Sequence, residues 1–192
     1  MASNTVAQVQ LVLRLTLGLI FLASALAKLR HPTLFVRGVL DYQVLSTPLA
    51  GAYGRLLPFI ELGTALLLFS GFLLLIAIGL SILILLSFAI AIVVVLTHGR
   101  QLRCHCFGEA STGYVGWHTL GRDVLLLLVA LCLLVLVHLT GGSAPGWLST
   151  DFGWDAVAFA TAALIALTYE LIAQGLDVLM SLRHPRAIGE RW

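Results

Sequence analysis

An almost unbroken apolar run from Leu56 to Thr97 constrains this fold more than any other feature of the sequence. At 1.5 Å per residue the run would form about 63 Å of helix, roughly twice the thickness of the hydrocarbon core of a bilayer. The run must therefore turn once. The segment "FSGF" (69–72) is the plausible hinge, because Ser and Gly punctuate helices. We predict one span at residues 56–70 and another at residues 72–97.

The composition indicates that the rest of the chain shares this environment. Of the 192 residues, 60 % are hydrophobic and 10 % are charged, whereas a soluble domain carries about 25 % charged residues. Further spans are predicted at residues 6–28, 117–140 and 154–176. Backbone polar groups must pair within each span in lipid, so every span should be a helix. We predict an all-α transmembrane helical bundle with about five spans, forming a single membrane domain over residues 1–192.

The basic residues predict how this bundle is oriented. With five spans, ten of the eleven Lys and Arg residues fall on the side of the loops after the first and third spans and of the C-terminal tail. The exception, Arg14, lies within a span. Since Lys and Arg are enriched in cytoplasmic loops, we expect a cell-membrane protein with its N-terminus outside and residues 98–116 in the cytoplasm. The formal net charge of +2 gives no indication of nucleic-acid binding.

Ionisable side chains inside the spans are candidate functional residues, because a charge in hydrocarbon is costly. Arg14 and Lys28 share one face of the first helix with small residues, which suits a closely packed side of a bundle. The alternative is that both cations snorkel to the head groups. Glu61 lies at a depth similar to that of Lys28, so we predict an ion pair between them.

More ionisable residues gather on the same side of the predicted bundle. Five of them should converge beneath residues 104–106, in the loop of residues 98–116: Lys28, Glu61, Arg122, Asp123 and Glu170. This convergence favours a functional site. A purely structural network of ion pairs is the alternative.

That loop holds the most specific motif of the chain, "RCHCFGE" at residues 103–109. Cys104 and Cys106 can close only a small, strained ring, and strained disulfides are more easily reduced. The spacing therefore favours a redox-active dithiol over a structural disulfide. The supporting residues around the two cysteines are Arg100, Arg103, His105, Phe107 and Gly108. The basic side chains should lower the pKa of the thiols and raise the fraction of thiolate, and the glycine allows a turn.

Other interpretations of the cysteine pair stay open. The cysteines could be unreactive, or they could bind zinc or copper together with His105, His98 or His118. A c-type haem site would require C-x-x-C-H, which is absent from the sequence. Cys132 lies mid-span and should be a buried, unreactive thiol. Without a second cysteine pair, the motif must exchange electrons directly with a partner thiol or with a membrane carrier such as a quinone.

Three segments resemble the MauE branch of the DoxX-like membrane proteins: "LRLTLGLIFLASALAKLRHP" (13–32), "LPFIELGTALLLFSG" (57–71) and "CHCFGEASTGYVGWHTLGRDVLLL" (104–127). The matching positions are Arg14, Gly18, Lys28, Pro58, Glu61, Gly63, Cys104, Cys106, Phe107 and Gly108. His105 stands where the family usually has Gly, and Asp123 where it often has Asn.

The resemblance implies a four-helix core with one more C-terminal helix, and a redox-associated protein of the bacterial cell membrane. It also implies maturation of a disulfide-rich dehydrogenase subunit beside a thioredoxin-like partner. That work takes place outside the cytoplasmic membrane. The positive-inside rule, which we follow for the orientation, puts the cysteine loop inside.

Three hypotheses for the function result. In the first, the protein is a thiol–disulfide oxidoreductase or redox-maturation factor that acts through Cys104 and Cys106, with a thioredoxin-like protein or a quinone as its partner. The intramembrane residues Lys28, Glu61 and Arg122 would then form a pocket for a quinone-like head group or a proton path. In the second, the protein is a non-catalytic accessory or assembly subunit of a larger membrane complex. In the third, it is a Cys/His metal-binding membrane protein.

Overall fold

A computed structural model describes residues 2–98, 117–140 and 160–169, and every regular element within these ranges is a helix. This confirms the predicted all-α bundle. Among the described residues, four helices are long and apolar enough to cross a membrane: α1 (Ala2–Arg30), α3 (Thr47–Ser70), α4 (Leu74–Thr97) and α5 (Trp117–Leu139). Two shorter helices accompany them, α2 (Pro32–Tyr42) and an apolar helix at Ala160–Tyr169. The latter is the described part of the predicted span at residues 154–176.

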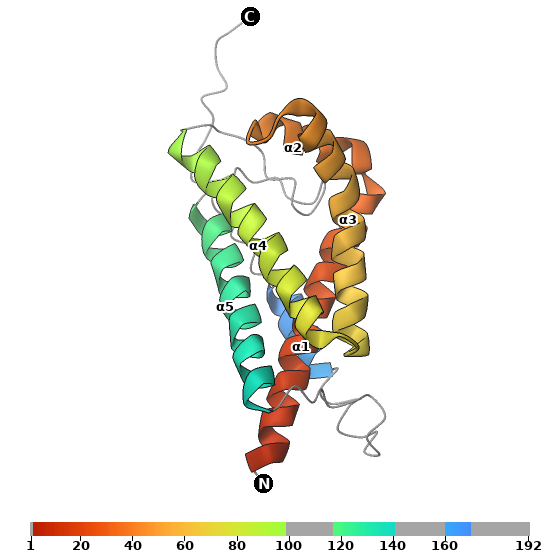
Figure 1. The fold of residues 1–192 in the computed structure, drawn as a ribbon, viewed down its shortest axis with the longest axis vertical. Helices are drawn as coiled ribbons and strands as arrows, with labels where there is room; N and C mark the ends of the chain where they lie inside the picture. The colour runs from red at the N-terminus through yellow and green to blue at the C-terminus, as the bar shows by residue number, and fades with distance from the viewer. Residues whose placement is uncertain (1, 99–116, 141–159, 170–192) are drawn as a thin grey trace, which may run out of the picture.

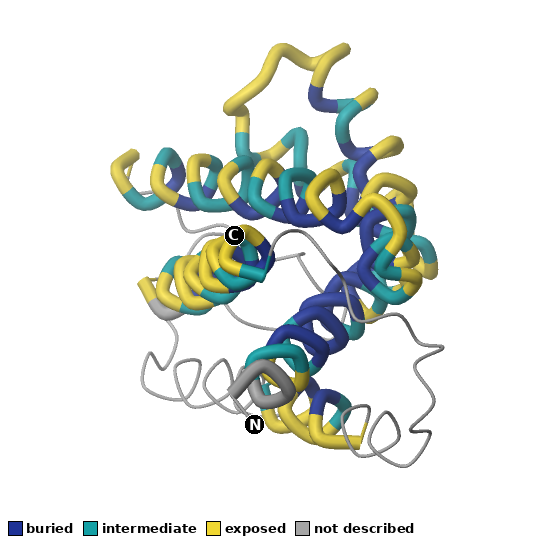
Figure 2. Tube along the Cα trace, turned by 60° about the horizontal axis from the view of Figure 1, so that its bottom comes forward, coloured by how far each residue is buried: buried dark blue, intermediate teal, exposed yellow. Residues whose placement is uncertain are grey.

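The long helices run up and down along the bundle (Figure 1). α1 and α4 run toward the end that carries α2, whereas α3 and α5 run away from it. We call this end the α2 end. α1 packs mainly along α3, and α5 packs against α4 and α1. α1 is consequently the most buried of the spans, whereas the other helices expose apolar outer faces that suit contact with lipid (Figure 2).

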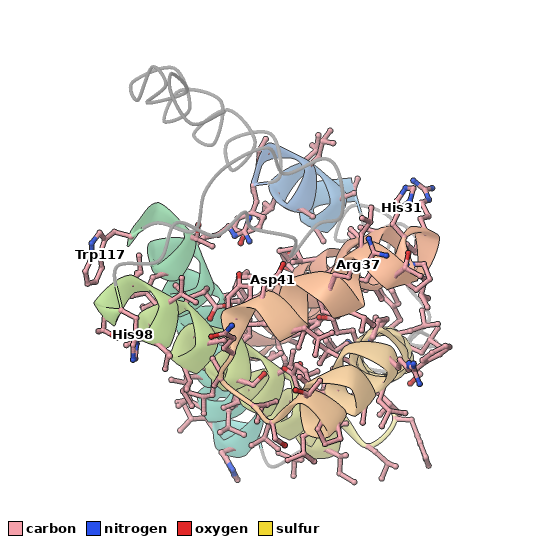
Figure 3. The ribbon with its side chains drawn as sticks, turned by 90° about the horizontal axis from the view of Figure 1, so that it is seen from above. His31, Arg37, Asp41, His98 and Trp117 are labelled. Carbon is pink, nitrogen blue, oxygen red and sulfur yellow. The ribbon has the colours of Figure 1, made fainter. Side chains whose placement is uncertain are left out.

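α2 was not predicted, because its eleven residues lie in the long loop expected between the first two spans. Pro32 stands in the first turn of the helix, where its missing N–H is no loss. Phe35 is buried beneath α2, while Arg37 and Asp41 are exposed. Figure 3 shows these two residues on the outer side of the α2 end. α2 is thus a short amphipathic helix that covers this end of the bundle.

α3 begins at Thr47 instead of residue 56, so the second long helix includes part of the expected loop. A proline in its first turn suits the start of a helix, as it does in α2. At the other end, α3 stops at Ser70 and the chain turns within the expected hinge segment. Gly71 has φ +68°, and a Cβ on this residue would overlap the guanidinium group of Arg14. The turn therefore requires glycine both for its backbone conformation and for this close approach.

The prediction for Cys132 is wrong, because this residue is exposed on the outer face of α5. An apolar stretch indicates burial within protein only in a soluble domain. In a membrane span the side that faces lipid is equally apolar, so hydropathy alone does not distinguish the two faces.

Candidate functional site

Lys28 on α1 and Glu61 on α3 form an ion pair inside the bundle. Both residues are fully buried, with 0 % of their surface exposed. Ser24, one helical turn before Lys28, joins the two charges. It accepts a hydrogen bond from Lys28 Nζ at 2.9 Å, and its hydroxyl donates to Glu61 Oε2 at 3.4 Å. The structure therefore contains the ion pair that the sequence predicts.

Two aromatic rings complete the surroundings of the Lys28 ammonium group. Its Nζ lies 5.1 Å from the ring centroid of Phe35 on α2 and 4.6 Å from that of Phe88 on α4. Both distances are within the range in which a cation is attracted to the face of a ring. Lys28 thus holds α1, α2, α3 and α4 together at one point.

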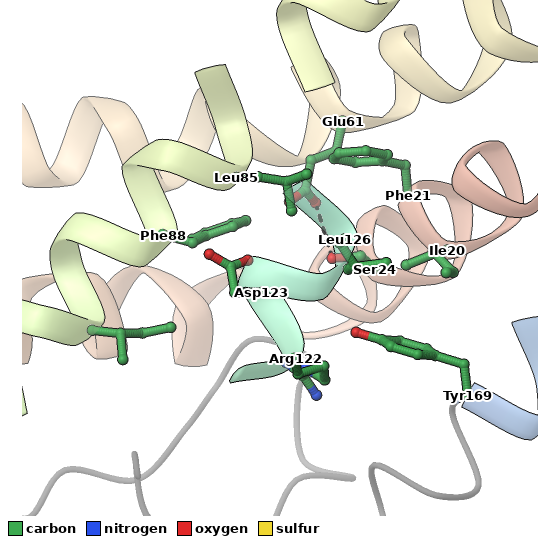
Figure 4. Close-up of a pocket in the computed structure, with 11 residues that line it drawn as sticks. Ile20, Phe21, Ser24, Glu61, Leu85, Phe88, Arg122, Asp123, Leu126 and Tyr169 are labelled. Carbon is green, nitrogen blue, oxygen red and sulfur yellow. Dashed lines mark hydrogen bonds between the residues drawn. The ribbon is translucent and has the colours of Figure 1, made fainter. Parts of the chain in front are cut away.

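A cavity of about 40 Å³ lies beside the ion pair. Its polar lining comes from Ser24 on α1, Glu61 on α3, Arg122 and Asp123 on α5, and Tyr169 at the end of the short helix Ala160–Tyr169 (Figure 4). Asp123 is buried, and Arg122 is half-buried. The structure therefore brings four of the five predicted convergent residues to one place, since Lys28 is bound to Glu61 at the edge of this cavity.

The volume of this small cavity restricts what it can hold. A cavity needs roughly 10–15 Å³ of such volume to hold a water molecule, whereas a cavity that binds benzene measures about 150 Å³. The small cavity therefore has room for water, and its volume is well below that of a cavity that holds an aromatic ring.

Arg14 does not belong to this cluster. It lies fourteen residues before Lys28, about 21 Å along α1, and is fully buried against the turn at Gly71. Near it, Gly18 admits the ring of Phe69, because a Cβ there would lie 2.9 Å from Phe69 Cε1. Arg14 is therefore enclosed by protein instead of snorkelling to the head groups.

The remaining predicted site residues lie outside the described residues: Arg100, Arg103, Cys104, His105, Cys106, Phe107, Gly108 and Glu170. The side chain of His118 is likewise not described, so the alternative metal site stays a prediction. The structure does define where the cysteine segment joins the bundle. α4 ends at Thr97 and α5 begins at Trp117, both at the α2 end, where the Lys28–Glu61 pair lies.

Four residues around the ion pair were not predicted from the sequence: Ser24, Phe35, Phe88 and Tyr169. Ser24 precedes Lys28 by four residues, so the i, i+4 rule for helices could have found it. Phe35 could have been found only if α2 had been recognised as a helix in the sequence. Phe88 and Tyr169 carry no local signal, since only the packing of their helices brings them to the site.

These helices and the enclosed charges define a multi-pass helical membrane protein with an intramembrane polar cluster near one end of the bundle. The sequence profile of the family described as "Methylamine utilisation protein MauE" matches residues 6–136, so the chain belongs to the MauE family. It is also 34 % identical over 161 residues to the methylamine utilization protein MauE of Paracoccus denitrificans, which covers 83 % of this chain and 84 % of the relative. No solved structure matches the chain significantly.

Proposed function

We propose that this protein is a membrane thiol–disulfide redox factor that supports the maturation of a partner protein through Cys104 and Cys106. The observation that carries the proposal is the buried polar cluster around Lys28 and Glu61. It lies at the end of the bundle where the cysteine segment leaves α4 and enters α5. The name of the family and of its Paracoccus denitrificans member supports a role in methylamine utilisation.

Thiol–disulfide exchange defines what the cysteines would do. A thiolate of the reduced partner attacks the Cys104–Cys106 disulfide and forms a mixed disulfide. A second partner thiolate resolves this intermediate, which leaves the partner oxidised and both cysteines reduced. When a membrane carrier reoxidises them, two S–H bonds break, one S–S bond forms, and two electrons and two protons leave.

The small polar cavity supports the proton transfer of this cycle. Its lining includes two carboxylates and two hydroxyl groups, from Glu61, Asp123, Ser24 and Tyr169. A water held among such groups can accept a proton on one side and release one on the other. We propose that this cavity carries protons from the cysteine segment, while the Lys28 ammonium group keeps the Glu61 carboxylate in place.

Replacing the cysteines one at a time tests the proposal. We expect Cys104→Ser and Cys106→Ser each to abolish oxidation of the partner, and one of them to accumulate a mixed disulfide with a thioredoxin-like protein on non-reducing gels. Cys132→Ser is the matched control and should behave as the wild type, because Cys132 lies on the outer face of α5. An unchanged redox state of the partner in both motif variants contradicts the proposal.

The orientation is part of the same proposal, with the cysteine segment in the cytoplasm. Arg30, Arg37 and Arg55 are exposed near the α2 end, in agreement with the positive-inside rule. A membrane-impermeant thiol reagent should then label Cys104 and Cys106 in inverted vesicles but not in right-side-out vesicles. Labelling in right-side-out vesicles alone would contradict the cytoplasmic orientation and place the cysteine motif on the outer face of the membrane.

A non-catalytic accessory subunit is the second candidate function. The complete enclosure of the Lys28–Glu61 pair by four helices favours it, since an ion pair of this kind can serve stability or register alone. In that case the cysteine variants retain wild-type activity, and the protein copurifies in a fixed ratio with a larger membrane complex.

A further inference from the structure

A second and larger cavity, of about 330 Å³, lies between α2, the segment that follows it, α3 and α4. Its walls include four aromatic rings, from Phe35, Tyr42, Tyr53 and Phe88, and the rest of its lining is mostly aliphatic. This volume reaches the range of small-molecule sites, which measure about 300–1,000 Å³ and are mostly apolar with a few placed polar groups. It also exceeds the roughly 150 Å³ that accommodates a benzene ring.

The polar feature of this cavity is a pair of hydroxyl groups. Tyr53 Oη and Ser87 Oγ lie 2.6 Å apart, and Ser87 donates a hydrogen bond to the carbonyl oxygen of Ile84 at 2.7 Å. Tyr53 is therefore the donor to Ser87. If Ser87 turns its proton to Tyr53 instead, the Tyr53 proton can point to a ligand carbonyl. The pair can thus accept from a ligand hydroxyl or donate to a ligand carbonyl.

The larger cavity adjoins the polar cluster. Phe35 and Phe88 line it, and the same two rings contact the Lys28 ammonium group. Phe88 and Ile92 line both cavities, so these side chains form the wall between them. Ile92 lies five residues before Thr97, the last residue of α4, which is about 7.5 Å along the helix. The cysteine segment begins just beyond that point.

We infer that the larger cavity binds the ring of a membrane-soluble quinone, with one ring oxygen at the Tyr53–Ser87 pair. A flat ring suits the aromatic walls. The ring oxygen is a carbonyl in the quinone and a hydroxyl in the quinol. The Tyr53–Ser87 pair can donate a hydrogen bond to the first and accept one from the second. A lipid acyl chain would use the apolar walls but not the hydroxyl groups.

The redox step of this inference rests on the proposed function, whereas the binding does not. Cys104 and Cys106 lose two S–H bonds and gain one S–S bond. The quinone takes up the two electrons and two protons and becomes the quinol. Atoms and electrons balance without another reactant.

Binding of a decyl-substituted benzoquinone to the full chain in nanodiscs, followed by quenching of intrinsic fluorescence, tests the cavity. Ala91→Phe puts a ring into the cavity and should weaken binding at least tenfold. Ala89→Phe is the matched control, because it makes the same change on the same helix at a residue that lines neither cavity. If Ala91→Phe does not fold, Tyr53→Phe removes a hydroxyl without adding volume and should weaken binding about tenfold.

Three results overturn the inference: no quinone binding by the wild type, binding unchanged by both Ala91→Phe and Tyr53→Phe, or a photoreactive fatty acid that labels this cavity and resists displacement by the quinone. The Cys104→Ser/Cys106→Ser double variant separates this inference from the proposed function. It should bind the quinone as the wild type does but fail to reduce it when a dithiol is supplied. Wild-type protein that binds the quinone without thiol-dependent reduction refutes the proposed function and leaves the binding site intact.

Discussion

Removing one charge of the Lys28–Glu61 pair leaves the other charge buried without its partner. Both residues have 0 % of their surface exposed, so water cannot replace the lost group without rearrangement of the helices. Breaking a buried ion pair in this way costs about 3–5 kcal/mol, whereas replacing both partners by apolar residues of similar volume is often neutral. Lys28→Met and Glu61→Leu are apolar substitutions of similar size.

The expected magnitudes follow from the contacts of the pair. Each single variant should lower the free energy of unfolding by about 3–5 kcal/mol. Independent effects would add to about 6–10 kcal/mol in the double variant. We expect the double variant to lose only about 1–3 kcal/mol, chiefly because the buried Ser24 hydroxyl loses its bonds to both charges. Adding Ser24→Ala should recover most of that remaining loss.

Unfolding in mixed detergent micelles, followed by tryptophan fluorescence with increasing denaturant, measures these differences. Arg37→Met is the control, since it removes an exposed basic group on α2 and should change stability by less than about 0.5 kcal/mol. The reasoning is refuted if the single variants stay within about 1 kcal/mol of the wild type. It is also refuted if the double variant is as unstable as the sum of the single variants.

Two further predictions concern the packing of the bundle. Gly71→Ala should lower the free energy of unfolding by at least about 1 kcal/mol, because φ is positive and the Cβ would overlap the Arg14 guanidinium group. Gly79→Ala is the control, because nothing lies within 4 Å of the added Cβ. In the same denaturation assay it should be neutral or stabilising by up to about 1 kcal/mol. Equal effects of the two substitutions on the free energy of unfolding would contradict the prediction. Cys132 should react in nanodiscs with a lipid-soluble maleimide and not with a charged one; labelling by the charged reagent would contradict a lipid-facing position.

Features that depend on the cost of burying polar groups in lipid could be predicted from the sequence. The turn at Gly71 follows from the length of the apolar run, because no straight helix of that length fits the bilayer. The Lys28–Glu61 pair follows from the depth of two charges that each need a partner. Both arguments use position along the chain and the thickness of the membrane, and neither needs the details of side-chain packing.

Features that depend on lateral packing could not be predicted in this way. α2 is a short amphipathic helix of eleven residues, too few for a membrane span, so a search for long apolar runs does not detect it. The exposure of Cys132 depends on which face of α5 meets its neighbours, and hydropathy does not reveal this in lipid. The sizes of the two cavities depend on Phe88 and Ile92, which separate them, and so on the fit of several helices at once.

The burial of two cations on α1 has a consequence for how the chain enters the bilayer. Lys28 precedes its partner Glu61 by 33 residues, and Arg14 is covered by a turn that is synthesised later still. An arginine near the centre of an inserting helix costs about 2.5–3.5 kcal/mol. The nascent α1 must offset this cost with its own apolar side chains alone until α3 emerges from the ribosome. Release of α1 from the translocon into lipid is therefore most favourable together with α3, as a prepaired hairpin.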